Sequence, residues 1–318
     1  MNKKKKSPAP PFVPDADRPV EMPFDSIHLS IQEAVEKITV PRIRHACRSA
    51  FNHLRKSWIL HPVDAEMSAF RAITAEEEAA SAVIRALRHQ SYPNAESLNV
   101  RDHKHKSALW PFITAVNDKM VEKRIAAPTL SLRLEGSPRI ELSIDLGSQA
   151  GLDHPLWGTP DEPFNFVMSS DRTGRFKPHD FSEELHSLAT GKGSGSIETF
   201  VKAEANNRNQ LLYASDQGMP SVQFEDAYLL GRRQRVVVLV VLTIAIMQTT
   251  AHQLFLVQCL NALLRALQRF DGDLVELPKI DRREPRLEMA EQEDGTMELI
   301  HVQPITKLSF SYTIKPEP

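Results

Sequence analysis

Apolar residues recur at every third or fourth position through most of residues 30–125, which is the spacing of one buried helix face. The pattern is clearest in RIRHACRSAFNHLRKSWIL and in AEMSAFRAITAEEEAASAVIRALRHQ. Pro62 and Asp64 stand before the second stretch as helix start signals. A further helix is expected over residues 101–125. The first third of the chain is therefore predicted to form long amphipathic helices that pack together.

The period changes to two in TLSLRLEGSPRIELSIDL, where apolar and polar residues alternate on both sides of the turn EGSP. This pattern predicts a half-buried β-hairpin over residues 129–146. A hairpin alone is only marginally stable, and the alternating chain end TMELIHVQPITKLSFSYTIK offers partner strands. One small antiparallel sheet built from both regions is expected. The predicted fold class is therefore mainly α (α+β), with an inserted β-hairpin and a C-terminal strand pair beside the helices.

A second helical region is expected over residues 195–270. Its strictly apolar run, Val236 to Met247, covers twelve residues, whereas a membrane-spanning helix needs about twenty. Polar residues from Gln248 onward interrupt the run, which favours a buried core helix over a membrane span. The chain is therefore predicted to have five parts. Residues 1–29 form a basic, Pro-rich disordered tail, and residues 271–318 form a C-terminal extension with strands. Residues 30–125 and 195–270 form the two halves of a helical bundle, and residues 126–194 form an insertion between them.

Composition narrows the function classes. The 318 residues carry a formal net charge of -2, so nucleic-acid binding would need a local basic patch. The two cysteines, Cys47 and Cys259, lie far apart and in helical patterns, which predicts no disulfide and fits a reducing, cytoplasmic location. The basic N-terminus has no apolar segment behind it, so it is not expected to be a secretory signal.

One acidic patch lies on a predicted helix. Glu77 falls on the same apolar face as Ile73 and Ala80, and a carboxylate at a buried position is costly unless it is paired. Glu76 and Glu78 are expected to point further outward. The alternative is an ordinary charged helix face.

A second polar patch, RDHKHK, opens the next predicted helix. His103 and Lys106 lie one helical turn apart and could face and neutralise Glu77. The alternative is a basic helix entry exposed to solvent. A metal site from Glu77, His103 and His105 is conceivable, but the Glu-x-x-His spacing of di-iron bundles is absent. No metal and no cofactor are expected.

A third patch is NNRNQLLYASDQGMP. Arg208 could clamp a phosphate with its planar guanidinium. Tyr213 could stack on a base or hydrogen-bond a carboxylate. The alternative is a helix C-terminus with a buried tyrosine, followed by a turn.

Taken in order, these patches resemble the AbiV branch of the HEPN helical-bundle superfamily. The resemblance covers roughly residues 40–120 and 195–270, and the hairpin region would be an insertion. Two positions depart from the family pattern: Ser81 replaces the usual basic residue, and Tyr213 stands where RNase members have histidine. The matching residues are Ala75, Glu77, Glu78, Asp102, His103, Lys106, Arg208, Leu212, Tyr213, Asp216, Gly218 and Pro220.

The resemblance implies an abortive-infection protein that defends against phage as a symmetric homodimer, with metal-independent RNase activity as the first of two hypotheses. In this hypothesis His103 transfers protons, Glu77 orients it, Arg208 and Lys106 hold phosphate, and Tyr213 positions the substrate. The alternative is a non-catalytic module that binds a partner protein or an antitoxin. The near-neutral net charge and Tyr213 favour this alternative. DNA is not expected as a partner, and a membrane partner is the least favoured hypothesis.

Overall fold

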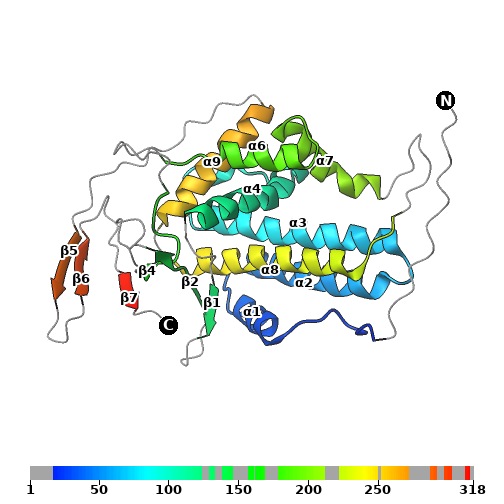
Figure 1. Cartoon of the computed structure of the whole chain (residues 1–318). Helices are drawn as coiled ribbons and strands as arrows, with labels where there is room; N and C mark the ends of the chain where they lie inside the picture. The colour runs from blue at the N-terminus through cyan, green and yellow to red at the C-terminus, as the bar shows by residue number, and fades with distance from the viewer. Residues whose placement is uncertain are drawn as a thin grey trace.

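The computed structural model describes a mainly helical protein in which the longest helices run side by side (Figure 1). This confirms the predicted helical bundle. The described residues are 17–123, 129–132, 138–145, 157–160, 162–168, 178–211, 222–249, 252–271, 287–291, 297–302 and 312–315.

The helices fall into two groups along the chain. The first group is α1 (Ser26–Glu36), α2 (Pro41–Leu60), α3 (Ala65–His89), the short 3-10 helix η1 (Ala95–Ser97) and α4 (His103–Glu122). The second group is α6 (Ser182–Gly191), α7 (Ile197–Gln210), α8 (Asp226–Gln248) and α9 (Leu254–Asp271). Both groups contribute to one apolar core.

Three of these helices begin at an aspartate whose side chain accepts hydrogen bonds from backbone amides of the first turn. Asp25 caps α1, Asp64 caps α3 as expected, and Asp102 caps α4. Hydrogen bonds from the backbone and side chain of His28 hold the pKa of Asp25 below its usual range. These caps fix where α3 and α4 start, and so fix which of their residues face each other.

Helix α3 is the central helix of the bundle. It packs most extensively against α2 and α8 and also contacts α4. In Figure 1, α4 lies above α3 and α2 lies below it. Small side chains let the neighbouring helices come close, and the fully buried alanines of α3 are Ala72, Ala75, Ala79, Ala80, Ala82 and Ala86.

The segment before α1 is held against α2 and α8. Arg18 Nε lies 2.8 Å from Asp226 Oδ2 on α8, and its guanidinium carbon lies 3.9 Å from the centre of the Trp58 ring. Trp58 Nε1 donates to the carbonyl of Pro19 at 2.8 Å. The predicted disordered tail over residues 1–29 therefore extends too far, since the part from Arg18 onward packs on the bundle. Residues 1–16 lie outside the described part.

The apolar run of α8 is core rather than a membrane span. Val236, Leu239 and Val240 are buried against the other helices. Among the described residues, no helix combines the length and the apolar character needed to cross a membrane.

The two cysteines are free, as expected from their positions in separate helices. Cys47 is buried in α2, and burial raises the pKa of its thiol to about 12. Burial also raises the pKa of Cys259 in α9. Both side chains are therefore protonated thiols at neutral pH and behave as small apolar residues.

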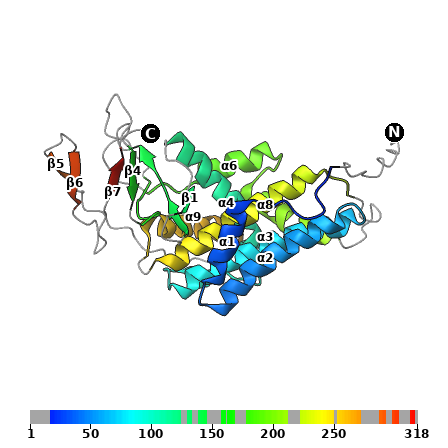
Figure 2. The same cartoon turned by 90° about the horizontal axis from the view of Figure 1, so that it is seen from below.

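The described strands form short antiparallel pairs. In the hairpin, β1 (Thr129–Leu132) pairs with β2 (Pro138–Glu141), with Leu130 opposite Ile140. Strand β4 (Trp157–Pro160) lies between β3 (Ile144–Asp145) and β7 (Tyr312–Lys315), and β5 (Leu287–Glu291) pairs with β6 (Met297–Val302). Figure 2 shows β5, β6 and β7 on one side of the helices. The single small sheet predicted from both regions stays a prediction.

A half-buried carboxylate, Glu184, links helix α6 to α4. Glu184 lies 2.9 Å from His179 Nε2 and 3.2 Å from Lys119 Nζ of α4. Burial raises the pKa of Glu184, but its hydrogen bonds to His179 and Lys119 lower it more, so the pKa lies below the usual glutamate value.

We expect Leu54→Ala to lower the free energy of unfolding by about 2–5 kcal/mol, because Leu54 is fully buried and its truncation leaves a cavity. Ile59→Ala is the matched control on the same helix, since Ile59 is 57% exposed and its loss should change stability by only about 0.5 kcal/mol. Urea denaturation followed by circular dichroism measures both. Equal effects of the two substitutions would contradict the placement of α2.

The lowered pKa of Glu184 makes the stability of the α4–α6 contact depend on pH. The contribution is present above the unfolded-state pKa of about 4.3 and is lost as the pH falls through the lower folded-state pKa. Glu184→Gln should therefore lower stability at neutral pH and flatten the acid side of the stability–pH curve. Denaturation across the acid range measures this, and an unchanged acid limb in Glu184→Gln would contradict it.

Candidate functional site

The structure brings Glu77, His103 and Lys106 together between α3 and α4. His103 Nδ1 lies 2.7 Å from Glu77 Oε1, and Lys106 Nζ lies 3.4 Å from Glu77 Oε2. Glu77 is only 6% exposed, whereas the His103 side chain is 45% exposed. A buried carboxylate thus holds an imidazole that reaches solvent.

The start of α4 explains this arrangement. Asp102 accepts a hydrogen bond from the Lys104 amide and so fixes the first turn of the helix. His103 and Lys106, three residues apart, then lie on the face turned toward α3. Two neighbouring cationic side chains can therefore reach the same carboxylate.

His105 belongs to a different contact. Its Nδ1 accepts a hydrogen bond from the Asn99 amide at 2.8 Å, and its Nε2 lies 4.0 Å from Asp102. Within the described ranges, no three histidine, cysteine, aspartate or glutamate side chains are grouped so that they could hold a metal ion.

Glu76 corrects one expectation. It is buried rather than pointing outward, because α8 packs on the side of α3 next to the one that α4 covers. Arg232 Nη1 donates to Glu76 Oε2, and Arg235 Nη1 lies 3.4 Å from the same oxygen. Burial lowers the pKa of Arg232, but the negative charge of Glu76 raises it more, so this guanidinium stays charged.

Arg232 and Arg235 are site residues that the sequence analysis missed. They stand three residues apart in GRRQR, directly before the apolar run of α8. Their signal was the spacing itself, which puts two cations on one face of the helix just before its apolar run. Arg235 also contacts an aromatic side chain, since its guanidinium carbon lies 5.3 Å from the centre of the Trp110 ring on α4.

The third sequence patch is described only in part. Helix α7 carries the backbone of Arg208, while the Arg208 side chain and all of Tyr213 lie outside the described part of the chain. Helix α7 packs against α4, which carries His103 and Lys106, and also contacts α3. The helices that bear the three patches are therefore neighbours.

The arrangement can carry out proton transfer. When the Nδ1–H of His103 is donated to Glu77, the neutral ring has its lone pair on Nε2. The carboxylate also stabilises the imidazolium that forms when Nε2 takes a proton. Lys106 adds a positive charge beside the Glu77 carboxylate.

Comparison of the chain with protein-family models, with curated proteins and with solved structures gives no match. Membership of the AbiV branch therefore stays a prediction. The chemistry of the site has to be inferred from Glu77, His103 and Lys106 themselves.

We expect Glu76→Ala to lower the free energy of unfolding by about 3–5 kcal/mol, because it leaves the charge of Arg232 buried without its partner. Glu78→Ala is the control, since this neighbouring glutamate is less buried and should cost about 0.5 kcal/mol. The double variant Glu76→Met/Arg232→Met should recover much of the loss, because it removes both buried charges. Chemical denaturation measures all three, and a small effect of Glu76→Ala would contradict the buried ion pair.

Proposed function

We propose that this chain is a HEPN-like abortive-infection protein that cleaves RNA without a metal ion. The observation that carries the proposal is the 2.7 Å contact between the buried Glu77 carboxylate and the solvent-reaching imidazole of His103, with Lys106 beside it. A carboxylate-oriented histidine and a nearby cation are the groups that metal-free cleavage of a phosphodiester needs.

In the proposed reaction, His103 Nε2 removes the proton from a ribose 2′-hydroxyl. The 2′-oxygen attacks the adjacent phosphorus, and the bond from phosphorus to the 5′-oxygen breaks. The departing 5′-oxygen takes a proton from water, so the products are a 2′,3′-cyclic phosphate and a 5′-hydroxyl end. Lys106 and Arg208 offset the negative charge that builds up on the phosphorane, and Tyr213 positions the substrate.

The resemblance supports two further parts of the proposal: two copies form a homodimer that shares a cleft, and the protein acts in defence against phage. The two free cysteines support a cytoplasmic location. The hairpin region is an insertion into the HEPN-like bundle and forms one small sheet with the chain end. The pairing of β4 with β7 supports this last point, because it links the insertion to the C-terminal extension.

A second candidate function is a non-catalytic module that binds a partner protein or an antitoxin. The observation that favours it is charge balance inside the bundle. Glu76 contacts Arg232 and Arg235, and Glu77 contacts His103 and Lys106, so each buried carboxylate is matched by basic groups. A network of this kind can serve only to stabilise the bundle, with no catalytic role.

The proposal predicts that the purified protein cleaves RNA in the presence of EDTA and leaves 2′,3′-cyclic phosphate ends. His103→Ala should lower the rate by about 10²–10⁴-fold, which is the usual contribution of a general base. Arg208→Ala should also lower it, because the phosphorane charge loses a cation. Gel analysis of a broad RNA pool, with end-group analysis of the products, measures each effect.

The control is His186→Ala, which removes an exposed histidine on α6 and should leave the rate unchanged. Glu77→Gln tests positioning, since it should lower the rate and also shift the pH profile of cleavage. A folded wild-type protein that leaves the whole RNA pool intact would contradict the nuclease and favour the binding module.

A further inference from the structure

Helix α2 is strongly basic in a chain that is nearly neutral overall. Its 20 residues contain no aspartate or glutamate, whereas the whole chain has a net charge of -2. The lysine and arginine residues on α2 are Arg42, Arg44, Arg48, Arg55 and Lys56. Helix α2 therefore carries a local concentration of positive charge that the composition alone could not show.

Three of these arginines share one exposed face of α2 with His45 and Asn52. Arg42, His45, Arg48, Asn52 and Arg55 are exposed and recur at three- or four-residue spacing, so they form a single line along the helix. Over this line the helix rises by about 20 Å, at 1.5 Å per residue. That length matches an extended polymer better than a small molecule.

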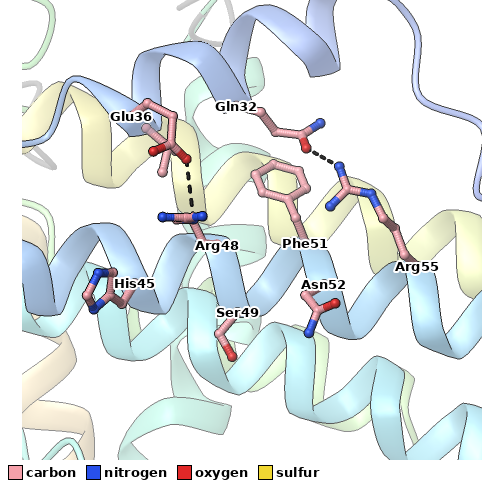
Figure 3. A pocket seen from close by; sticks show the side chains of 9 residues that line it. Gln32, Glu36, His45, Arg48, Ser49, Phe51, Asn52 and Arg55 are labelled. Carbon is pink, nitrogen blue, oxygen red and sulfur yellow. Dashed lines mark hydrogen bonds and ion pairs between the residues drawn. The ribbon is translucent and has the colours of Figure 1, made fainter.

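A groove of about 610 Å³ runs beside this line, between α1 and α2 (Figure 3). The polar side chains that line it include Gln32, Glu36, His45, Arg48, Asn52 and Arg55. The apolar lining residues, Val35 and Phe51, are buried beneath them. The groove therefore offers cations and hydrogen-bonding groups but no apolar side chain for insertion into lipid.

The positive charge of the groove is only weakly offset. Glu36 lies 3.4 Å from Arg48, and both side chains are more than half exposed, so this ion pair is weak and easily exchanged. Arg55 donates to the side-chain carbonyl of Gln32, which is neutral and leaves the arginine charge in place. Both contacts are visible in Figure 3.

We propose that this face of α2, with the groove beside it, binds the phosphodiester backbone of single-stranded RNA. Guanidinium groups pair well with phosphate oxygens, and a line of them can follow successive phosphates. The choice of RNA among polyanions rests on the proposed function. The face lies on the other side of α3 from α4, so it is a docking surface separate from His103 (Figure 1).

The test is the binding of a fluorescently labelled single-stranded RNA to the full chain carrying His103→Ala, measured by anisotropy over a series of salt concentrations. Adding Arg48→Gln/Arg55→Gln should weaken binding on the order of tenfold at low salt and reduce the slope of log affinity against log salt by about 1.4, since each lost phosphate contact removes about 0.7. The charge-conserving pair Arg48→Lys/Arg55→Lys should keep most of the slope.

Two further variants sharpen the test. Glu36→Gln should tighten binding, because it removes the negative charge next to Arg48. Lys192→Gln/Arg265→Gln removes two exposed charges from other elements and should leave the affinity nearly unchanged. Unchanged binding by Arg48→Gln/Arg55→Gln, or an equal loss in Lys192→Gln/Arg265→Gln, would overturn the assignment. Binding to phosphatidylglycerol vesicles in place of RNA would also overturn it.

The outcome also separates this surface from the proposed nuclease. RNA binding that depends on Arg48 and Arg55, without cleavage by the wild type, would keep the surface and overturn the nuclease. Cleavage whose KM and salt dependence are the same in wild type and Arg48→Gln/Arg55→Gln would keep the nuclease and overturn the surface.

Discussion

Two adjacent carboxylates buried in the central helix set the main constraint on this bundle. A charge inside a protein is tolerated only when opposite charges and hydrogen bonds replace the water it has lost. Glu76 meets this condition through α8, and Glu77 meets it through α4. The alanines of α3 let neighbouring helices approach, but they fix no rotation or register. The ion pairs fix the rotation and the register of the helices, because Arg232 and His103 reach their partners from only one helical face.

The same contact that stabilises the fold also defines the candidate chemistry. Glu77 is buried deeply enough to be a structural ion-pair partner, and it holds an imidazole that is nearly half exposed. The contact between α3 and α4 therefore joins the stability of the fold and the proposed chemistry in one place, and a substitution there is expected to change both.

The sequence predicted this contact well because its evidence was local. The position of Glu77 on an apolar stripe, and the one-turn spacing of His103 and Lys106, follow from helical periodicity. The inward position of Glu76 did not follow, since a single stripe describes a helix buried on one side, and α3 is covered by α2, α4 and α8. Arg232 was missed because the apolar stripe of α3 does not show that α8 covers the side of α3 that carries Glu76. The end of the N-terminal tail was misjudged because Arg18 is held by Asp226, which is distant in sequence. Arg208 and Tyr213 stay predictions.

The separation of Glu76 from Arg232 along the chain has a consequence for protein synthesis. The two residues are 156 positions apart, so at ordinary translation rates the ribosome makes the arginine roughly 8–30 s after the glutamate. During that interval α2, α3 and α4 can form, but α3 lacks the helix that covers and neutralises Glu76. The nascent chain must keep this carboxylate in water until α8 emerges, so the central helix is made early and becomes buried late.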